Sequence, residues 1–130
     1  MSDITDVTEF LEKYYDTFSR LDVESITPFF CEPCIFISPQ GVVAAQTYEH
    51  VKGVFRIIAE GLRSKEYGRS ELTDLRVQQM SNVTALATGT AVRYKRDGQE
   101  LERVGVTYIL QKSDNGWKIA VTVIHDAAQA

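Results

Sequence analysis

Residues 69–126 carry turn signals at regular spacing between long β-rich segments, and this pattern constrains the fold more than any other feature. Ser81-Asn82, Asp97-Gly98 and Asn115-Gly116 separate runs rich in Val, Thr, Leu and Ala. Asp-Gly and Asn-Gly are typical of tight hairpins because both tolerate the positive φ that such turns require. The pattern predicts four consecutive antiparallel strands, at about 70–80, 83–95, 100–112 and 117–126. Strands of this length twist strongly, so the sheet is expected to curl and to wrap around a helix.

Helical patterns precede this β-rich region. Apolar residues recur every three or four positions over residues 4–20, which predicts an amphipathic helix. Asp22 is a suitable N-cap for a second, shorter helix at 23–31. Helical spacing returns over residues 48–64. The apolar positions of the first and third helices are Ile4, Val7, Leu11, Tyr14, Phe18 and Leu21, and Tyr48, Val51, Phe55, Ile58 and Leu62.

Two further strands are expected between the second and third helices. Pro33 breaks the helical pattern, and residues 34–38 favour a strand, followed by a Pro-Gln-Gly turn and a short partner strand at 42–45. The order of helices, short strands, helix and meander predicts an α+β fold with the helices packed on one face of a sheet.

Composition excludes several classes of protein. A chain of 130 residues with 44% hydrophobic residues fits one domain, 1–130, with a core of its own. The net charge of −4 does not favour a nucleic-acid partner, which normally selects a basic face. No apolar run approaches the ~20 residues that span a bilayer, so no membrane partner is expected. Because the N-terminal segment is acidic where a secretory signal would be basic, we expect a cytoplasmic location.

Two local motifs resemble the nuclear transport factor 2-like superfamily, which includes ketosteroid isomerase and the polyketide-cyclase-like (SnoaL-like) proteins. Residues 21–30, Leu-Asp-Val-Glu-Ser-Ile-Thr-Pro-Phe-Phe, resemble the family's Gly-Asp and short helix, with Leu21 where glycine is usual. Residues 116–119, Gly-Trp-Lys-Ile, resemble its hairpin into the last strand. The resemblance extends from Phe10 to Asp126. It implies a cystatin-like α+β roll, in which a cone-shaped, curved antiparallel sheet wraps around the N-terminal helices and encloses an apolar cavity.

The resemblance therefore implies a protein that binds a small apolar or aromatic molecule in its cone. We expect no cofactor and no metal ion. Alternation along the last strand places His125 on the same face as Trp117 and Ile119, towards the core or the cavity mouth. The predicted ligand-binding residues are Tyr14, Phe18, Phe36, Ser38, Val51, Phe55, Ile58 and His125.

Ketosteroid isomerase activity is not expected. Aligned on Leu21-Asp22, the oxyanion-hole tyrosine of that enzyme corresponds to Tyr14, but its general-base aspartate corresponds to Ser38. No Asp or Glu occurs from residue 34 to 48 or from 104 to 110, where the two acids would lie. A serine hydroxyl cannot accept a proton near neutral pH.

Two alternatives remain open from the sequence. One is an enzyme of the cyclase, isomerase or dehydratase type that uses His125 with Tyr14. The other is a protein-interaction module with a filled cone. Dehydratase-like chemistry with two histidines is disfavoured because His50 lies beside the apolar stripe, and an epoxide-hydrolase-like cluster around Asp74, Arg76 and Arg93 lacks an evident second acid.

Two other features have simpler explanations. Cys31 and Cys34 have the C-x-x-C spacing, but they are expected to close a helix and enter a strand, the opposite order to redox enzymes, so we expect free thiols. The alternating charges of residues 93–103 predict cross-strand ion pairs around the 97–98 turn.

The strand at 83–95 is apolar on both faces, which predicts a homodimer through the outer sheet face.

Overall fold

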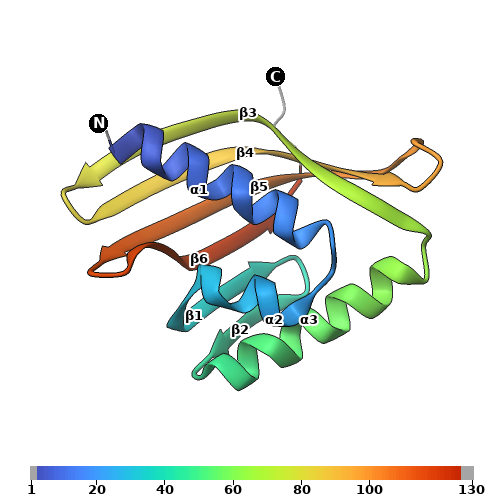
Figure 1. Cartoon of the computed structure of the whole chain (residues 1–130), viewed down its shortest axis with the longest axis horizontal. Helices are drawn as coiled ribbons and strands as arrows, with labels where there is room; N and C mark the ends of the chain where they lie inside the picture. Colours follow the sequence, from blue (N-terminus) through green and yellow to red (C-terminus); the bar gives the residue numbers. More distant parts are fainter. Residues whose placement is uncertain (1–2, 127–130) are drawn as a thin grey trace.

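The computed structural model describes residues 3–126, and Figure 1 shows a curved sheet with the helices on its concave side. The helices are α1 (Asp3–Phe18), α2 (Val23–Ile26), the 3₁₀ turn η1 (Thr27–Phe29) and α3 (Tyr48–Arg63). The strands are β1 (Phe30–Ser38), β2 (Gly41–Ala45), β3 (Tyr67–Ser81), β4 (Thr84–Lys95), β5 (Glu100–Ser113) and β6 (Gly116–His125). The predicted α+β fold is confirmed.

The six strands form one sheet in the order β2-β1-β6-β5-β4-β3. Strands β3 to β6 are the predicted antiparallel meander, and β1 and β2 form a hairpin. Contrary to the prediction of an antiparallel sheet, one pairing is parallel, that of β1 with β6. Gly98 and Gly116 both have a φ of 92°, which is the left-handed backbone expected at the Asp-Gly and Asn-Gly turns.

The curvature of the meander arises from irregular pairing and small side chains. The register between β3 and β4 shifts between Thr73 and Arg76, and a bulge of this kind bends a strand and increases its twist. Gly89 of β4 lies directly under this bend: a Cβ there would be 3.0 Å from both Leu72 Cδ1 and the Thr73 carbonyl oxygen. The inner face of β4 carries only small residues around Gly89, which leaves room for α1 and for a cavity.

The helices form the inner layer of the fold. From Val7 to Phe18 the stripe predicted for the first helix is buried, and so is the apolar side of α3 from Val51 onward. The first residue of each predicted stripe is exposed, Ile4 by 46% and Tyr48 by 37%. Leu21, which follows α1, has a φ of 55° and a buried side chain, so it holds the left-handed turn conformation that glycine tolerates best. None of the helices within residues 3–126 is long and apolar enough to cross a membrane.

The predicted helix at 23–31 is wrong in its second half. α2 ends at Ile26, and a 3₁₀ turn that contains Pro28 follows it, because proline has no N–H to continue an α-helix. β1 therefore begins at Phe30, so Cys31 and Cys34 lie within a strand and not at a helix end. Pro33 is tolerated there because the β1–β6 ladder is interrupted between Phe30 and Ile35.

Candidate functional site

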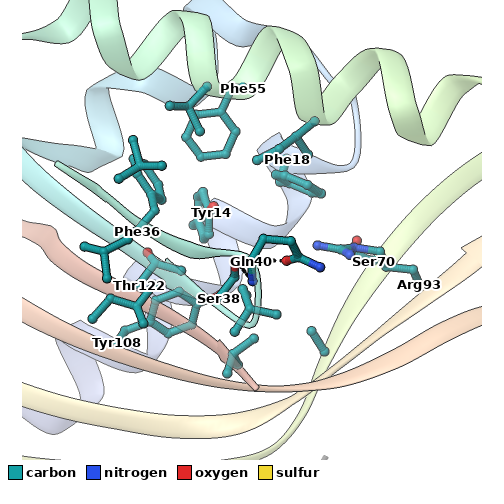
Figure 2. Close-up of a pocket in the computed structure, with 18 of the residues that line it drawn as sticks. Tyr14, Phe18, Phe36, Ser38, Gln40, Phe55, Ser70, Arg93, Tyr108 and Thr122 are labelled. Carbon is teal, nitrogen blue, oxygen red and sulfur yellow. Dashed lines mark hydrogen bonds between the residues drawn. The ribbon is translucent and has the colours of Figure 1, made fainter. Parts of the chain in front are cut away.

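A cavity of about 420 Å³ lies between the concave face of the sheet and helices α1 and α3 (Figure 2). Pockets that hold small organic ligands usually have volumes of roughly 300–1,000 Å³. Most of the lining is apolar or aromatic. The lining residues are Tyr14, Tyr15, Phe18, Phe36, Ile37, Ser38, Gln40, Gly41, Val42, Val43, Val54, Phe55, Ile58, Ser70, Ala91, Arg93, Val106, Tyr108, Thr122 and Ile124.

An aromatic cluster forms the wall of this cavity beside the helices. The Phe18 ring of α1 packs edge-on against Phe55 of α3, with ring centroids 6.2 Å apart. Phe55 in turn contacts Phe36 of β1, with ring centroids 5.7 Å apart. Figure 2 shows these three rings around the cavity with Tyr14 between them. Such rings present large, rigid faces, which suits an apolar or aromatic ligand.

A pair of tyrosine hydroxyls connects α1 to the sheet within the cavity lining. The hydroxyl oxygens of Tyr15 on α1 and Tyr108 on β5 are 2.6 Å apart, and both side chains are buried. Burial raises the pKa of Tyr15 to about 12, and it raises the pKa values of Tyr14 and Tyr108 well above the ordinary value. All three phenols are therefore neutral at physiological pH and cannot serve as bases.

Thr122 is the neighbour of Tyr108 across β5 and β6, and its side chain also faces the cavity side of the sheet. Its hydroxyl is buried and has no hydrogen-bond partner among residues 3–126. An unpaired buried hydroxyl destabilises a protein by about 1–3 kcal/mol. The hydroxyl of Thr122 therefore does not stabilise the fold through any hydrogen bond within residues 3–126.

Polar side chains from three strands meet at another part of the lining. Arg93 of β4 forms an ion pair with Glu102 of β5. Ser70 of β3 shares a 2.6 Å hydrogen bond with Tyr67. At the β1–β2 turn the Ser38 hydroxyl donates to the Gln40 side chain over 3.0 Å, which holds Gln40 over the cavity (Figure 2).

Six of the eight predicted site residues line the cavity: Tyr14, Phe18, Phe36, Ser38, Phe55 and Ile58. Val51 does not, although it is fully buried. The first turn of α3 is attached to β1, since the Tyr48 hydroxyl donates to the Phe30 carbonyl and the Tyr48 N–H donates to Glu32. Val51 belongs to the buried core of the fold, and Val54 of the same helix lines the cavity.

The predicted inward orientation of His125 is wrong. Ile109 and Leu110 are adjacent on β5, but their partners on β6 are Val121 and Ile119. Ala120 is therefore an extra residue that forms a bulge in β6. The extra residue reverses the alternation, so Thr122 and Ile124 face the cavity. His125 lies instead on the outer face, over Gly105, where its Nε2 is 3.1 Å from the Thr107 hydroxyl. His125 and Tyr14 therefore lie on opposite sides of the sheet.

The remaining polar and thiol residues that the sequence singled out do not line the cavity, with the exception of Arg93. His50 is exposed, as expected, and neither Asp74 nor Arg76 lines the cavity. Cys31 and Cys34 are free thiols, and burial raises both pKa values, that of Cys34 to about 11. Neither thiol is thus activated as a nucleophile. Cross-strand pairing is confirmed for Arg93 and Glu102.

The lining residues that were not predicted from the sequence include Tyr108, Thr122, Arg93, Ser70 and Gln40. Strand alternation could have indicated Arg93, since it shares the parity of the small residues Ala85, Ala87 and Ala91. No signal in the sequence marks the bulge at Ala120, on which the orientation of Thr122 depends.

Solved structures share this architecture. An NTF2-like protein of unknown function from Shewanella oneidensis MR-1 has a TM-score of 0.77 at 16% identity, covering 96% of this chain and 100% of that chain. Aln2 from a Streptomyces species has a TM-score of 0.77 at 17% identity, covering 94% and 89%. A candidate dehydratase from the NTF2-like family of Streptomyces avermitilis has a TM-score of 0.76 at 17% identity, covering 98% and 97%. At such identities these likenesses show the fold alone.

The architecture is thus that of an NTF2-like, cystatin-like α+β cone. Residues 4–127 match the family described as NTF2-like protein (DUF6841), and the chain belongs to that family. No curated protein matches the chain.

Proposed function

We propose that this chain is a cytoplasmic binding protein that holds a small apolar or aromatic molecule in its cone. The observation that carries the proposal is the cavity of about 420 Å³ with its mainly aromatic and aliphatic lining. A protein-interaction module with a filled cone would not need such a space. Burial of an apolar ligand there is favourable by roughly 25 cal/mol per Å² of apolar surface removed from water.

The lining gives no comparable support to an acid–base enzyme. Among the described lining residues there is no carboxylate and no imidazole. The tyrosines are held neutral by burial, and His125 lies on the other face of the sheet. A proton transfer of the cyclase, isomerase or dehydratase type would require a group with a pKa near the working pH within hydrogen-bond reach of the substrate.

The neutral fluorescent probe N-phenyl-1-naphthylamine tests the binding proposal. The wild-type protein is expected to bind the probe with a 1:1 stoichiometry and to increase its fluorescence. Ile58→Trp places a large side chain at the cavity lining and is expected to weaken binding at least tenfold, roughly 1.4 kcal/mol. Ile57→Trp is the matched control, because Ile57 is the neighbouring residue of α3 and is 74% exposed. No binding by wild type, or equal weakening by both variants, would contradict the proposal.

We further propose that a second copy of the chain covers the outer sheet face. Leu86, Ile109, Val121 and Ile35 are successive register partners across β4, β5, β6 and β1, so they form a continuous apolar row. Ile35 is 38% exposed, and the helices all lie on the opposite face (Figure 1). Two such rows can pack against each other around a twofold axis.

Light scattering after size-exclusion chromatography at micromolar concentration tests the dimer. Wild type is expected to have twice the mass of the chain, and Ile35→Lys is expected to shift the protein to the monomer. Ile57→Lys changes an exposed isoleucine on the helical side and is expected to leave the dimer intact. A monomeric wild type would refute the proposed interface.

A further inference from the structure

Arg93 is the only charged side chain among the described residues that line the cavity. Its side chain is 19% exposed, and its guanidinium carbon lies 5.8 Å from the centre of the Phe18 ring. Taking a cation out of water into an apolar lining is unfavourable unless the charge is compensated. The position of this charge in an otherwise apolar cavity therefore needs a physical reason.

Glu102 positions Arg93 but leaves it incompletely paired. The two residues are register partners on β4 and β5, and Nη1 of Arg93 donates to Oε2 of Glu102. Glu102 does not itself line the cavity. A guanidinium group has five N–H donors, and no other acceptor for Arg93 occurs among residues 3–126. Donors thus remain for a ligand.

The electrostatic effect inside the cavity comes from the arginine and not from its partner. The positive charge of Arg93 opposes the burial that raises the pKa values of Tyr14, Tyr15 and Tyr108, and Glu102 is not among the groups that shift them. The Glu102 carboxylate is the more exposed of the two groups, at 32% against 19% for Arg93, so water screens it more. Arg93 therefore attracts a negative charge placed near it in the cavity, while burial outweighs this attraction at the three tyrosines, whose net pKa shift is upward.

A second donor lies beside this position. Ser70 lines the cavity and shares its hydrogen bond with the Tyr67 hydroxyl, so it can accept from Tyr67 and donate its own proton to a ligand. In Figure 2 the Arg93 side chain extends past Ser70 toward Gln40. A cation and a hydroxyl at one end of an aromatic wall match the two ends of an amphipathic acid.

We propose that the ligand is an apolar or aromatic carboxylic acid whose carboxylate binds Arg93 and Ser70 while its body packs on Phe18 and Phe55. This inference rests on the proposed small-molecule binding and specifies its ligand class. A carboxylate suits the site because its planar pair of oxygens matches two N–H groups of one guanidinium.

The matched pair 2-naphthoate and 2-naphthamide tests the inference, because the two compounds differ in charge and hardly in shape. Competition with N-phenyl-1-naphthylamine gives both affinities. Wild type is expected to prefer the acid by about 10- to 100-fold, the range of hydrogen bonds to charged groups. Arg93→Met is expected to abolish this preference. Glu102→Gln is expected to increase the preference for the acid, because Arg93 then has no carboxylate of the protein as its partner.

Arg96→Met is the control for net charge, since Arg96 is exposed at the β4–β5 turn and does not line the cavity; the wild-type preference should persist. Circular dichroism spectra establish that each variant is folded. If wild type binds the probe but binds the acid no more tightly than the amide, the inference is refuted and the binding proposal stands. If Glu102→Gln lowers the preference, or Arg93→Met keeps it, the assigned role of Arg93 is wrong. If wild type binds neither the probe nor either naphthyl compound, both proposals fail.

Discussion

Replacing Tyr15 and Tyr108 by phenylalanine, singly and together, measures how the hydroxyl pair connects α1 to the sheet. Their oxygens are 2.6 Å apart in a buried part of the cavity wall, and each is the other's only hydrogen-bond partner among residues 3–126. Either single substitution leaves one buried hydroxyl without a partner, which costs about 1–3 kcal/mol. The double substitution removes both hydroxyls and leaves nothing unpaired, so it should cost less than the sum of the single changes.

The expected coupling free energy of the cycle is therefore about 1–3 kcal/mol. Urea denaturation gives the free energies of unfolding, with Trp117, the only tryptophan in the chain, as the fluorescent reporter. Tyr94→Phe is the control, because its exposed hydroxyl only reaches Glu71 over 3.3 Å, and its effect should stay within about 0.5 kcal/mol. Single effects that add in the double variant to within about 0.5 kcal/mol would refute the reasoning, because the hydroxyls would then act independently.

Three further predictions concern stability. Thr122→Val should raise the free energy of unfolding by about 1–3 kcal/mol, because it removes an unpaired buried hydroxyl. Thr107→Val removes the hydroxyl that bonds His125 Nε2 and should lower the free energy of unfolding in the same denaturation assay; equal signs for the two variants would contradict this. Gly105→Ala should destabilise by about 1–3 kcal/mol, because its Cβ would lie 2.6 Å from the backbone carbonyl oxygen of Asp126 as well as 2.4 Å from His125 Cε1. Gly53→Ala, with open space around it on α3, should stabilise, and a harmless Gly105→Ala would disprove the close contact. The raised pKa values of Tyr14, Tyr15 and Tyr108 stabilise the folded protein, and this stability is fully present below pH 10. It is lost as the pH rises from 10 towards the pKa values of the folded state, about 12 for Tyr15, by about 1.4 kcal/mol per pH unit for each tyrosine. Absorbance at 295 nm follows tyrosine ionisation, and ionisation of all six tyrosines near pH 10 in the folded protein would contradict the buried placement.

The predictable parts of the fold are those set by residues close together in the chain. The apolar stripe of the first helix and the Asp-Gly turn at residue 98 are patterns of a few residues, and both produced the expected element. Where a single backbone irregularity intervened, the same reasoning failed. Pro28 ended the second helix early, which placed Cys31 in a strand.

The candidate site was predicted in part for the same reason. Tyr14, Phe18, Phe55 and Ile58 belong to helical stripes, so their inward direction follows from helical spacing alone. The inward direction of His125 was inferred from an alternation that one extra residue reverses. The bulge at Ala120 depends on how β6 meets β5 and not on the residues of β6 themselves.

The residues of this chain thus specify its helices, its hairpins and the aromatic side of the cavity, because spacing and turn chemistry are local properties. Only the folded sheet decides which charges face inward. Arg93 and Glu102 are nine residues apart in a segment of alternating charges, and the sequence predicts an ion pair between strands with no indication of a cavity beside it. It is the curvature of the sheet over α1 and α3 that encloses the guanidinium group of Arg93 next to Phe18.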